Sequence, residues 1–355
     1  MRAPGVVVVF AHLRYDGVRQ RPQHLMSRLA RRADVLYVEE PLAGAADRDE
    51  RFAADGLTVL RPHRRAPSEA IDAATLGSVR DWLRGRPACA WFYTPMMSGA
   101  LDAIAFARVA FDAMDDLSSF RFAPPALLAR EAALLARADV VFAGGASLYE
   151  RLRQRIGVPD KLLPFASGIE WAHFAAAAAP GAAIDPLVRA LAGPVFGYYG
   201  VIDERIDLSL FAELAAGGGD VVAAGPFAKI DPRELPGGTR IHYTGLVPYA
   251  RLPALLAGFD VALMPFAASD ATRHLSPTKT PEYLAGGRPV VSTEIADVRR
   301  FYGEVVDVVP RERFVEHAYA RAAAPVPGRA ARGAALARRA DWDAIADGMW
   351  AALTR

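Results

Sequence analysis

The stretch SPTKTPEYLAGGRPVV, Ser276–Val291, has the residue types and spacing in this chain that best suit the binding of an anion. Ser276, Pro277 and Thr278 come first, and such residues start helices because hydroxyls cap free backbone N–H groups and proline fits a first turn. Backbone N–H groups at a helix start attract anions, and Lys279 adds a full positive charge there.

Glu282 lies one turn further into the same predicted helix, where its carboxylate could accept hydrogen bonds from sugar hydroxyls. Gly286 and Gly287 then stop the helix. Together these residues predict a site for a ligand that carries phosphates and a ribose. An ordinary capped helix, with Lys279 solvated and Glu282 favouring the helix dipole, explains the stretch equally well when it is considered alone.

A second loop, Gly200–Asp207, follows an apolar run and precedes a helical pattern. Gly200 permits close backbone approach, and Arg205 can grip phosphate oxygens with a bidentate fork. A surface ion pair of Arg205 with Asp203 or Asp207 is the alternative, and this loop alone favours it. Lys279 is expected on another loop of the same sheet edge. Arg205 and Lys279 together would then offset the charge of a diphosphate, which carries about two negative charges.

Two common nucleotide-binding motifs are missing from the sequence. No G-x-G-x-x-G follows a predicted strand, and G-x-x-x-x-G-K-[ST] occurs nowhere in the chain. Their absence argues against a nicotinamide dinucleotide site and against a P-loop.

Short apolar runs alternate with amphipathic stretches along the whole chain, which is typical of parallel sheets wrapped by helices. The predicted strands are Val6–Ala11, Val35–Val38, Leu57–Leu60, Ala88–Tyr93, Val109–Asp112, Val140–Ala143, Leu162–Phe165, Val195–Tyr199, Val221–Ala224, Ile241–Tyr243, Val261–Pro265, Val290–Ser292 and Val305–Val309. The segment 175–193, rich in alanine, proline and glycine, predicts a linker. We therefore expect an α/β protein of two doubly wound domains, 1–174 and 194–337.

The end of the chain predicts one more helix, within 338–355, because Trp342, Ile345, Met349 and Leu353 share a helical face. Open α/β sheets bind ligands outside the carboxyl ends of their strands. If the two domains face each other, the cleft between them is the expected site.

Composition narrows the function classes. The 355 residues suffice for two cores, and no apolar run approaches the ~20 residues that span a bilayer. The single cysteine, Cys89, excludes an internal disulfide and suits a reducing cytoplasm, and a formal charge of +2 gives no strong case for nucleic acid. Arg28, Arg31 and Arg32 are candidates for contact with a membrane surface, although a solvated helix face is the favoured alternative.

Several segments in combination resemble group 1 glycosyltransferases of the two-domain GT-B fold, in particular bacterial enzymes of teichuronic-acid and other envelope polysaccharide synthesis. The second half contributes Gly197–Gly200, Asp203–Asp207, Gly245–Tyr249, Phe259–Phe266 and Ser276–Ala285. The first half contributes Gln20–Leu25, Glu40-Pro41 and Phe111-Asp112 with Asp115-Asp116. The resemblance covers nearly the whole chain, and its motifs are weak singly.

The resemblance implies two Rossmann-like domains facing each other across a cleft, with the last helix crossing back to the first domain. The second domain would bind a nucleotide-diphosphate sugar, with Arg205 and Lys279 as catalytic cations on the diphosphate and Glu282 on the ribose. The other donor-binding positions implied are Gly17, Gly200, Val247, His274, Ser276, Pro277 and Thr278.

His274 departs from the family pattern, because many relatives have a glutamate eight residues before the position of Glu282. His274 can still hydrogen-bond a sugar hydroxyl, but the donor sugar cannot be carried over. In the first half, Asp115 or Asp116 would face the cleft and contact acceptor or sugar hydroxyls. A plain capped turn accounts for these two aspartates about as well.

The expected activity is transfer of a sugar from a nucleotide-diphosphate donor to a glycan or lipid-linked acceptor in envelope polysaccharide synthesis. The resemblance implies retention of configuration, and two cations remove the need for a metal or another cofactor. We expect a cytoplasmic protein, peripheral on the inner membrane face where its acceptor requires it. The alternatives are a nucleotide-sugar epimerase of the same fold and a non-catalytic nucleotide-sugar-binding subunit, for which His274 is the best support.

Overall fold

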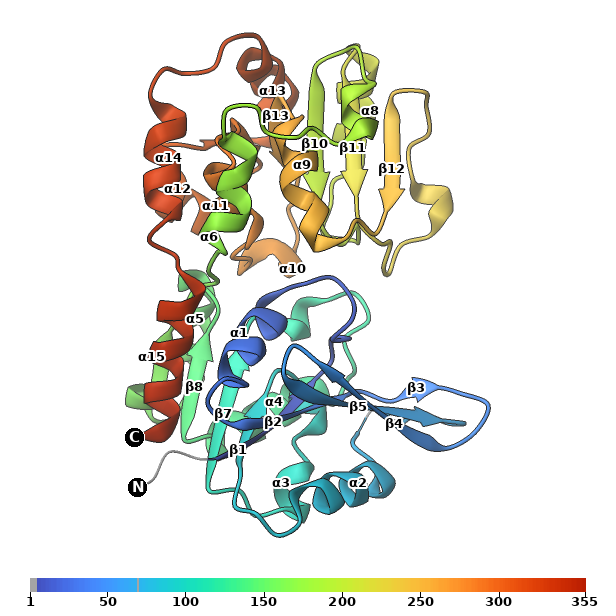
Figure 1. Cartoon of the computed structure of the whole chain (residues 1–355), viewed down its shortest axis with the longest axis vertical. Helices are drawn as coiled ribbons and strands as arrows, with labels where there is room; N and C mark the ends of the chain where they lie inside the picture. Colours follow the sequence, from blue (N-terminus) through green and yellow to red (C-terminus); the bar gives the residue numbers. More distant parts are fainter. Residues whose placement is uncertain (1–4, 69) are drawn as a thin grey trace. The chain divides into compact units, whose positions relative to one another are not determined.

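The chain forms two compact units in a computed structural model that describes residues 5–68 and 70–355. The first unit comprises Met1–Ala166 and Trp342–Arg355, and the second comprises Ser167–Asp341. Each unit is an α/β layer structure built on its own sheet (Figure 1). How the two units face each other stays a prediction.

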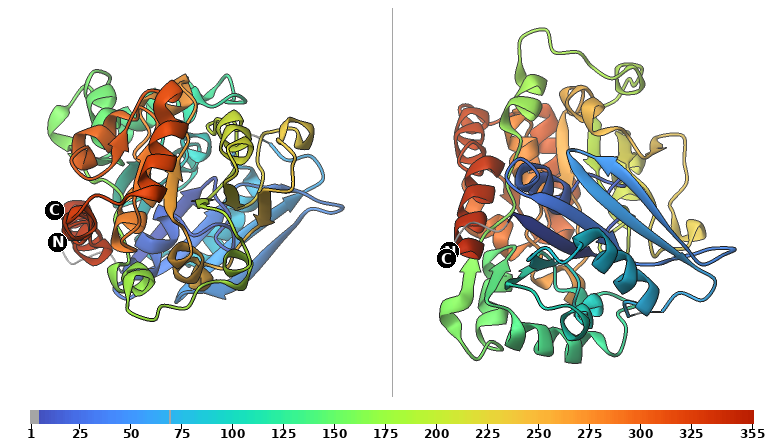
Figure 2. Two further views of the ribbon diagram at one scale, coloured as in Figure 1. Left: turned by 90° about the horizontal axis from the view of Figure 1, so that it is seen from above. Right: turned by 60° about the horizontal axis from the view of Figure 1, so that its bottom comes forward.

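The first unit is built on a nine-stranded sheet within the described residues, in the order β3-β5-β2-β1-β6-β7-β8-β9, with β4 pairing β5. The strands are β1 (Val6–Ala11), β2 (Asp34–Glu39), β3 (Leu42–Ala43), β4 (Arg48–Ala54), β5 (Leu57–Arg64), β6 (Cys89–Phe92), β7 (Arg108–Ala113), β8 (Val140–Ala143) and β9 (Leu162–Pro164). All pairs are parallel except β4 with β5, whose antiparallel hairpin extends from the sheet edge (Figure 2).

Helices cover both faces of this sheet. They are α1 (Arg21–Leu29), α2 (Ala73–Leu83), α3 (Ala100–Ala103), α4 (Leu127–Arg137), α5 (Ala146–Arg153) and α15 (Trp342–Thr354), with the short 3-10 helices η1 (Pro95–Met97), η2 (Leu117–Ser119) and η3 (Pro159–Lys161). Side chains alternate along β1, so Val7 and Val9 pack with α1 and α15 while Val8 and Phe10 pack with α2, α4 and α5. Both faces of the central strand are buried, as a parallel sheet requires.

The last helix, α15, is fixed to the first unit by a buried ion pair and by surface pairs. Arg21 and Asp112 are both fully buried, at 2.9 Å, and Arg21 also donates to the Phe165 carbonyl (2.8 Å) and contacts the Met349 sulfur (3.5 Å). This pair joins α1, β7 and α15. The helix proper starts at Trp342, four residues after the start of the expected segment 338–355.

The arginines considered for membrane contact are instead directed to α15. Arg28 pairs with Asp343 at 2.6 Å, and Arg32 pairs with Asp347. Arg31 lies 3.7 Å from Asp343 and stays largely exposed. These ion pairs tie Arg28, at the end of α1, and Arg32, just after it, to α15, whereas Arg31 stays exposed. Contact of these arginines with a membrane stays a prediction.

The second unit is built on a six-stranded parallel sheet, counted over its described residues, in the order β12-β11-β10-β13-β14-β15. The strands are β10 (Val195–Tyr199), β11 (Asp220–Ala224), β12 (Ile241–Gly245), β13 (Val261–Met264), β14 (Val290–Ser292) and β15 (Asp307–Val308). The helices are α6 (Trp171–Ala175), α7 (Pro186–Arg189), α8 (Ser209–Ala216), α9 (Leu252–Ala257), α10 (Asp270–Arg273), α11 (Lys279–Ala285), α12 (Ala296–Tyr302), α13 (Phe314–Ala323) and α14 (Arg329–Ala337), with η4 (Ala176–Ala178), η5 (Pro232–Glu234), η6 (Tyr249–Arg251) and η7 (Arg311–Arg313).

The segment expected as a linker, 175–193, lies inside the second unit. Its residues Ala177 and Val188 are buried in the core of that unit, and Asp185 pairs with Arg251 at 2.7 Å. The chain passes from the first unit to the second after Ala166, eight residues before the expected boundary. The alanine- and proline-rich composition resembles a linker, but its few apolar residues suffice to pack it.

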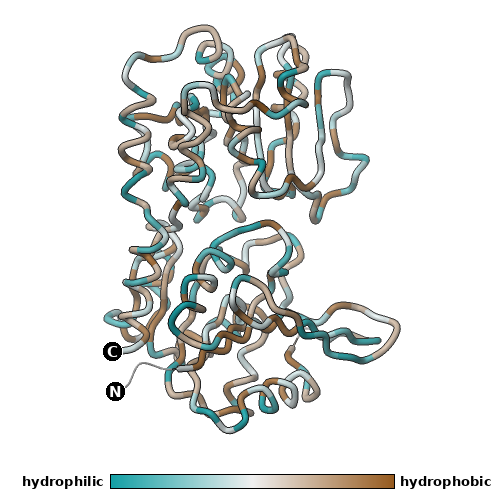
Figure 3. Tube along the Cα trace, viewed as in Figure 1, coloured by the Kyte–Doolittle hydropathy of each residue, from teal (hydrophilic) through white to brown (hydrophobic). Residues whose placement is uncertain are grey.

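Figure 3 shows polar and apolar stretches alternating along the chain. Within residues 5–68 and 70–355, none of the helices combines the length and apolar character that crossing a membrane requires.

Candidate functional site

The second unit has a switch point between β10 and β13, where the strand order reverses. Loops after strands at such a point leave the sheet on both sides of a crevice at the carboxyl edge. Here the two loops are also joined: Asp207 N donates to the Pro265 carbonyl, and Ala267 N donates to the Arg205 carbonyl, both at 2.8 Å. The fold therefore brings the loop of Arg205 and the segment of Lys279 to one edge.

Lys279 and Gly200 lie in direct contact at this edge. Gly200 has a φ of +132°, and a Cβ built on it would lie 2.1 Å from Cε and 2.6 Å from Nζ of Lys279. The Lys279 ammonium is 5.5 Å from the ring centroid of Tyr198, which lies near the end of β10. The lysine side chain thus occupies the space that any larger residue at 200 would need.

The backbone beneath Gly200 is equally tight. Gly225, which follows β11, has a φ of +153°, and a Cβ on it would lie 1.8 Å from the Gly200 carbonyl oxygen. Gly200 N donates to the Ala224 carbonyl at 2.8 Å, so the ends of β10 and β11 stay paired up to this point. Both positions need glycine, for conformation and for space.

Arg205 forms the ion pair with Asp203 that was the alternative to phosphate binding. Nε lies 3.0 Å from Oδ1 and Nη2 lies 2.7 Å from Oδ2 of Asp203, which is itself buried. The Arg205 charge also acts on Tyr198: burial raises the pKa of that phenol, and Arg205 opposes the rise. Tyr198 therefore lies near both Lys279 and Arg205, and the Asp203 carboxylate fixes the orientation of the arginine fork.

Glu282 is buried on α11, and burial raises its pKa to about 8. The nearby Lys279 ammonium and Tyr199 hydroxyl oppose this rise, while the charge of Glu170 adds to it. Burial therefore favours the protonated form of Glu282. A protonated carboxyl can both donate and accept a hydrogen bond.

The start of α11 differs from the expectation in one respect. The helix begins at Lys279, and Thr278 has helical dihedral angles and makes no side-chain capping hydrogen bond. The prediction that hydroxyls cap this helix is wrong for Thr278, because its backbone is not in the extended conformation that a cap needs. Ser276, Pro277 and Thr278 are partly buried between α10 and α11, and His274 is the residue that ends α10.

The remaining predicted positions are placed as follows. Val247, partly buried, comes two residues after β12 and packs on the core of the second unit. Gly17 is exposed in the loop after β1 of the first unit. Asp116, also in the first unit, is 2.8 Å from Arg151 and accepts a hydrogen bond from Ser118 at 2.7 Å. These contacts hold the Asp116 carboxylate in place, and its expected contact with acceptor or sugar hydroxyls stays a prediction.

Residue-by-residue reasoning did not assign roles to Tyr198, Tyr199 or Gly225. The two tyrosines stood in the motif Gly197–Gly200, but nothing in the sequence told which of them lies next to Lys279 and which next to Glu282. Gly225 was marked as a glycine of a loop that directly follows a predicted strand, but no role was assigned to it.

No family model matches this chain. A putative teichuronic acid biosynthesis glycosyltransferase, TuaH of Bacillus subtilis, is 24% identical over 251 residues, which are 66% of this chain and 61% of that protein. The chain thus aligns with about three fifths of that relative. The fold of the present chain is similar to that of the sucrose-phosphate synthase from Thermosynechococcus elongatus, with a TM-score of 0.73, 15% identity and 97% of each chain covered.

A second similar structure is that of Anabaena HepE in complex with UDP, with a TM-score of 0.66 and 13% identity over 97% of this chain and 98% of that one. At such identities the structural likeness shows the fold alone. The chain has the GT-B glycosyltransferase fold, which confirms the fold class expected from the sequence.

Proposed function

We propose that the protein is a glycosyltransferase that takes its sugar from a nucleotide-diphosphate donor bound by the second unit. The observation that carries this proposal is the placement of Lys279 across Gly200, with Arg205 nearby, at the switch point of the sheet. Support also comes from the glycosyltransferase fold, from the UDP in the HepE structure and from the name of the Bacillus relative.

In this proposal Lys279 and Arg205 act on the diphosphate. The bond between the sugar carbon and the diphosphate oxygen breaks as negative charge grows on that oxygen. Fixed cations stabilise this charge more than they stabilise the ground state, which is the condition for catalysis. Asp203 holds the Arg205 fork in place, so little reorganisation is needed when the donor binds.

Glu282 is assigned to the ribose. Its carboxyl is buried, which favours the protonated form, and a protonated carboxyl can both accept a hydrogen bond from a hydroxyl and donate one to a hydroxyl oxygen. His274 and the segment Ser276–Thr278 are assigned to the sugar and the phosphates, Val247 to the base, and Gly17 to the donor phosphates from the first unit. These assignments rest on the resemblance of the motifs.

The finer features of the reaction are also proposals. Two cations offset the charge of a diphosphate, so the proposed reaction uses no metal and no further cofactor. Retention of configuration needs no dedicated base, since the acceptor proton can pass to the departing phosphate oxygen. The acceptor proposed is a glycan or a lipid-linked glycan of envelope polysaccharide synthesis, reached from the cytoplasm. The epimerase and binding-subunit alternatives gain no support from the comparisons.

The test is sugar transfer with a matched pair of arginine variants. Arg205 and Arg233 each pair with an aspartate two residues earlier, and Arg233 is highly exposed. Removing one preorganised charge contact lowers turnover by about 10²–10³. We expect that loss for Arg205→Ala in donor hydrolysis or transfer, and full activity for Arg233→Ala. Full activity of Arg205→Ala would remove Arg205 from the proposal.

A further inference from the structure

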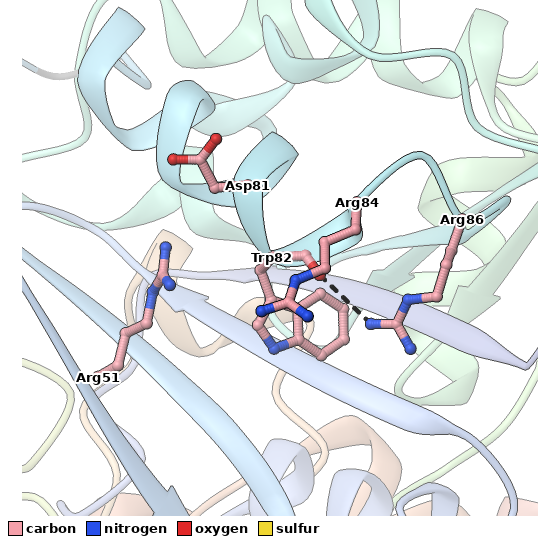
Figure 4. A pocket seen from close by; sticks show the side chains of 5 residues that line it. All are labelled: Arg51, Asp81, Trp82, Arg84 and Arg86. Atoms are coloured by element: carbon pink, nitrogen blue, oxygen red, sulfur yellow. Dashed lines mark hydrogen bonds between the residues drawn. The ribbon is translucent and has the colours of Figure 1, made fainter.

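A hollow on the surface of the first unit is surrounded by basic side chains around one tryptophan (Figure 4). Its lining residues are Arg51 of β4, Asp81 and Trp82 of α2, and Arg84 and Arg86 in the turn that leads to β6. Arg86 pairs at 2.6 Å with Asp34, the first residue of β2. The hollow therefore lies near the amino ends of β2 and β6, away from the carboxyl edge where open sheets bind their main ligand.

Arg84 is an unusual residue for its position. It ends α2 in the left-handed conformation, with φ 50° and ψ 40°, and its N–H donates to the Arg80 carbonyl at 3.0 Å. Glycine is the residue that fits such a helix end without strain. In the part of the chain that the structure describes, the Arg84 guanidinium makes no hydrogen bond or ion pair. Arg84 is exposed, and a cation at a helix C-terminus is favoured by the helix dipole, but neither its left-handed backbone nor a hydrogen-bonded protein partner favours arginine here.

The neighbouring guanidinium groups of Arg51 and Arg86 are exposed, but each contacts the protein. Arg86 lies over the Trp82 ring at 4.9 Å and donates to the carbonyls of Trp82 (3.3 Å) and Leu83 (3.2 Å). Arg51 donates to the Ser78 carbonyl at 2.9 Å. Figure 4 shows the Arg84 and Arg86 guanidinium groups both directed toward Trp82. Three like charges repel one another when they line one hollow.

Two carboxylates offset part of this charge. Asp34 is engaged by Arg86 outside the lining, and Asp81 is exposed on α2. Neither is hydrogen-bonded to Arg84. An anion in the hollow would relieve the remaining repulsion and give Arg84 a partner.

We propose that this hollow is a binding site for a phosphate group. A tetrahedral phosphate offers three or more oxygens that can accept from several guanidinium forks at once, whereas a carboxylate offers two. The Arg86 fork is oriented by its contact with the indole, and Arg84 supplies a fork that no protein group uses. This proposal does not depend on the proposed donor site, which lies in the other unit.

The test measures binding of inorganic phosphate by calorimetry to the chain carrying Lys279→Ala and Arg205→Ala, which removes both cations of the other proposed phosphate site. Arg84→Gly in that background removes the guanidinium and suits the backbone, so we expect at least about tenfold weaker binding and an unfolding temperature that does not fall. Arg80→Gln is the matched control. It removes one exposed charge from the same helix, outside the hollow, and should change the dissociation constant less than twofold.

A second arm identifies the source of the phosphate. The protein would be assigned a lipid-headgroup site if it co-sediments with vesicles of phosphatidylglycerol but not with vesicles of phosphatidylcholine, and if Arg84→Gly loses this co-sedimentation. Binding of inorganic phosphate without vesicle binding would assign it to a soluble phosphate compound. Unchanged phosphate affinity in Arg84→Gly, or equal losses in Arg84→Gly and Arg80→Gln, would overturn the proposal.

Discussion

Gly200→Ala tests the contact between Gly200 and Lys279. The added Cβ would lie 2.1 Å from Lys279 Cε and 2.6 Å from Nζ, far inside contact distance, so the lysine side chain must move away. The side chain is flexible, and its movement costs the fold little. Its ammonium then no longer reaches the place where the diphosphate is proposed to bind. Loss of a charge-assisted contact weakens binding by about tenfold to a hundredfold.

Backbone strain must be separated from this effect. Gly200 has a φ of +132°, where alanine is strained by roughly 1–3 kcal/mol. Gly238 provides the control, because its φ is +142° and a Cβ there would meet nothing within 4 Å. We expect both alanine variants to lose similar stability in urea unfolding. Only Gly200→Ala should lose affinity for the nucleoside diphosphate that the protein accepts, measured by calorimetry.

Two results would refute this reasoning. If Gly200→Ala binds the accepted diphosphate as tightly as the unmodified protein, Lys279 does not hold the diphosphate from its position over Gly200. If Gly238→Ala loses affinity for that diphosphate to the same extent, backbone strain and not the lysine contact is responsible.

Two further predictions concern buried charges. The folded-state pKa of Glu282, about 8, lies above its ordinary value of 4.5. Between these two values the folded protein keeps a proton that the unfolded chain releases, so stability falls as pH rises from 4.5 to about 8. The glutamine of Glu282→Gln cannot titrate. The free energy of unfolding of this variant minus that of the unmodified protein should therefore rise from pH 5 to pH 8 in urea titrations. A difference that does not depend on pH would contradict the assignment. Asp112→Asn leaves the buried Arg21 charge without its counter-ion and should cost about 3–5 kcal/mol. Asp343→Asn, at an exposed ion pair of α15, should cost no more than about 1 kcal/mol, and equal losses for the two variants would refute the role of the buried pair.

The sequence predicted the parallel strands well where apolar runs are continuous. Val6–Ala11 and Val195–Tyr199 form β1 and β10 with the expected bounds, because strands buried on both faces consist almost entirely of apolar residues. The hairpin strand β4, RDERFAA, was not predicted. It lies at the sheet edge with one face exposed, so its polar residues conceal the strand.

The candidate site was likewise predicted only in part. The order of predicted strands brought the loops of Arg205 and Lys279 to one edge, and the structure places both near Tyr198. The choice between Asp203 and a phosphate as the partner of Arg205 could not be made from sequence, because spacing alone gives no side-chain geometry. The packing of 175–193 into a core was also hidden, since its buried residues are few and mostly small.

The most direct test of the central claim compares a nucleoside diphosphate with its nucleoside. Calorimetry with UDP, GDP, ADP and dTDP would first find the base that the protein accepts. The account predicts that the accepted diphosphate binds at least tenfold more tightly than its nucleoside, and that Lys279→Ala removes most of this difference. Binding of none of the four, or a Lys279→Ala variant that keeps the full preference for the diphosphate, would contradict it.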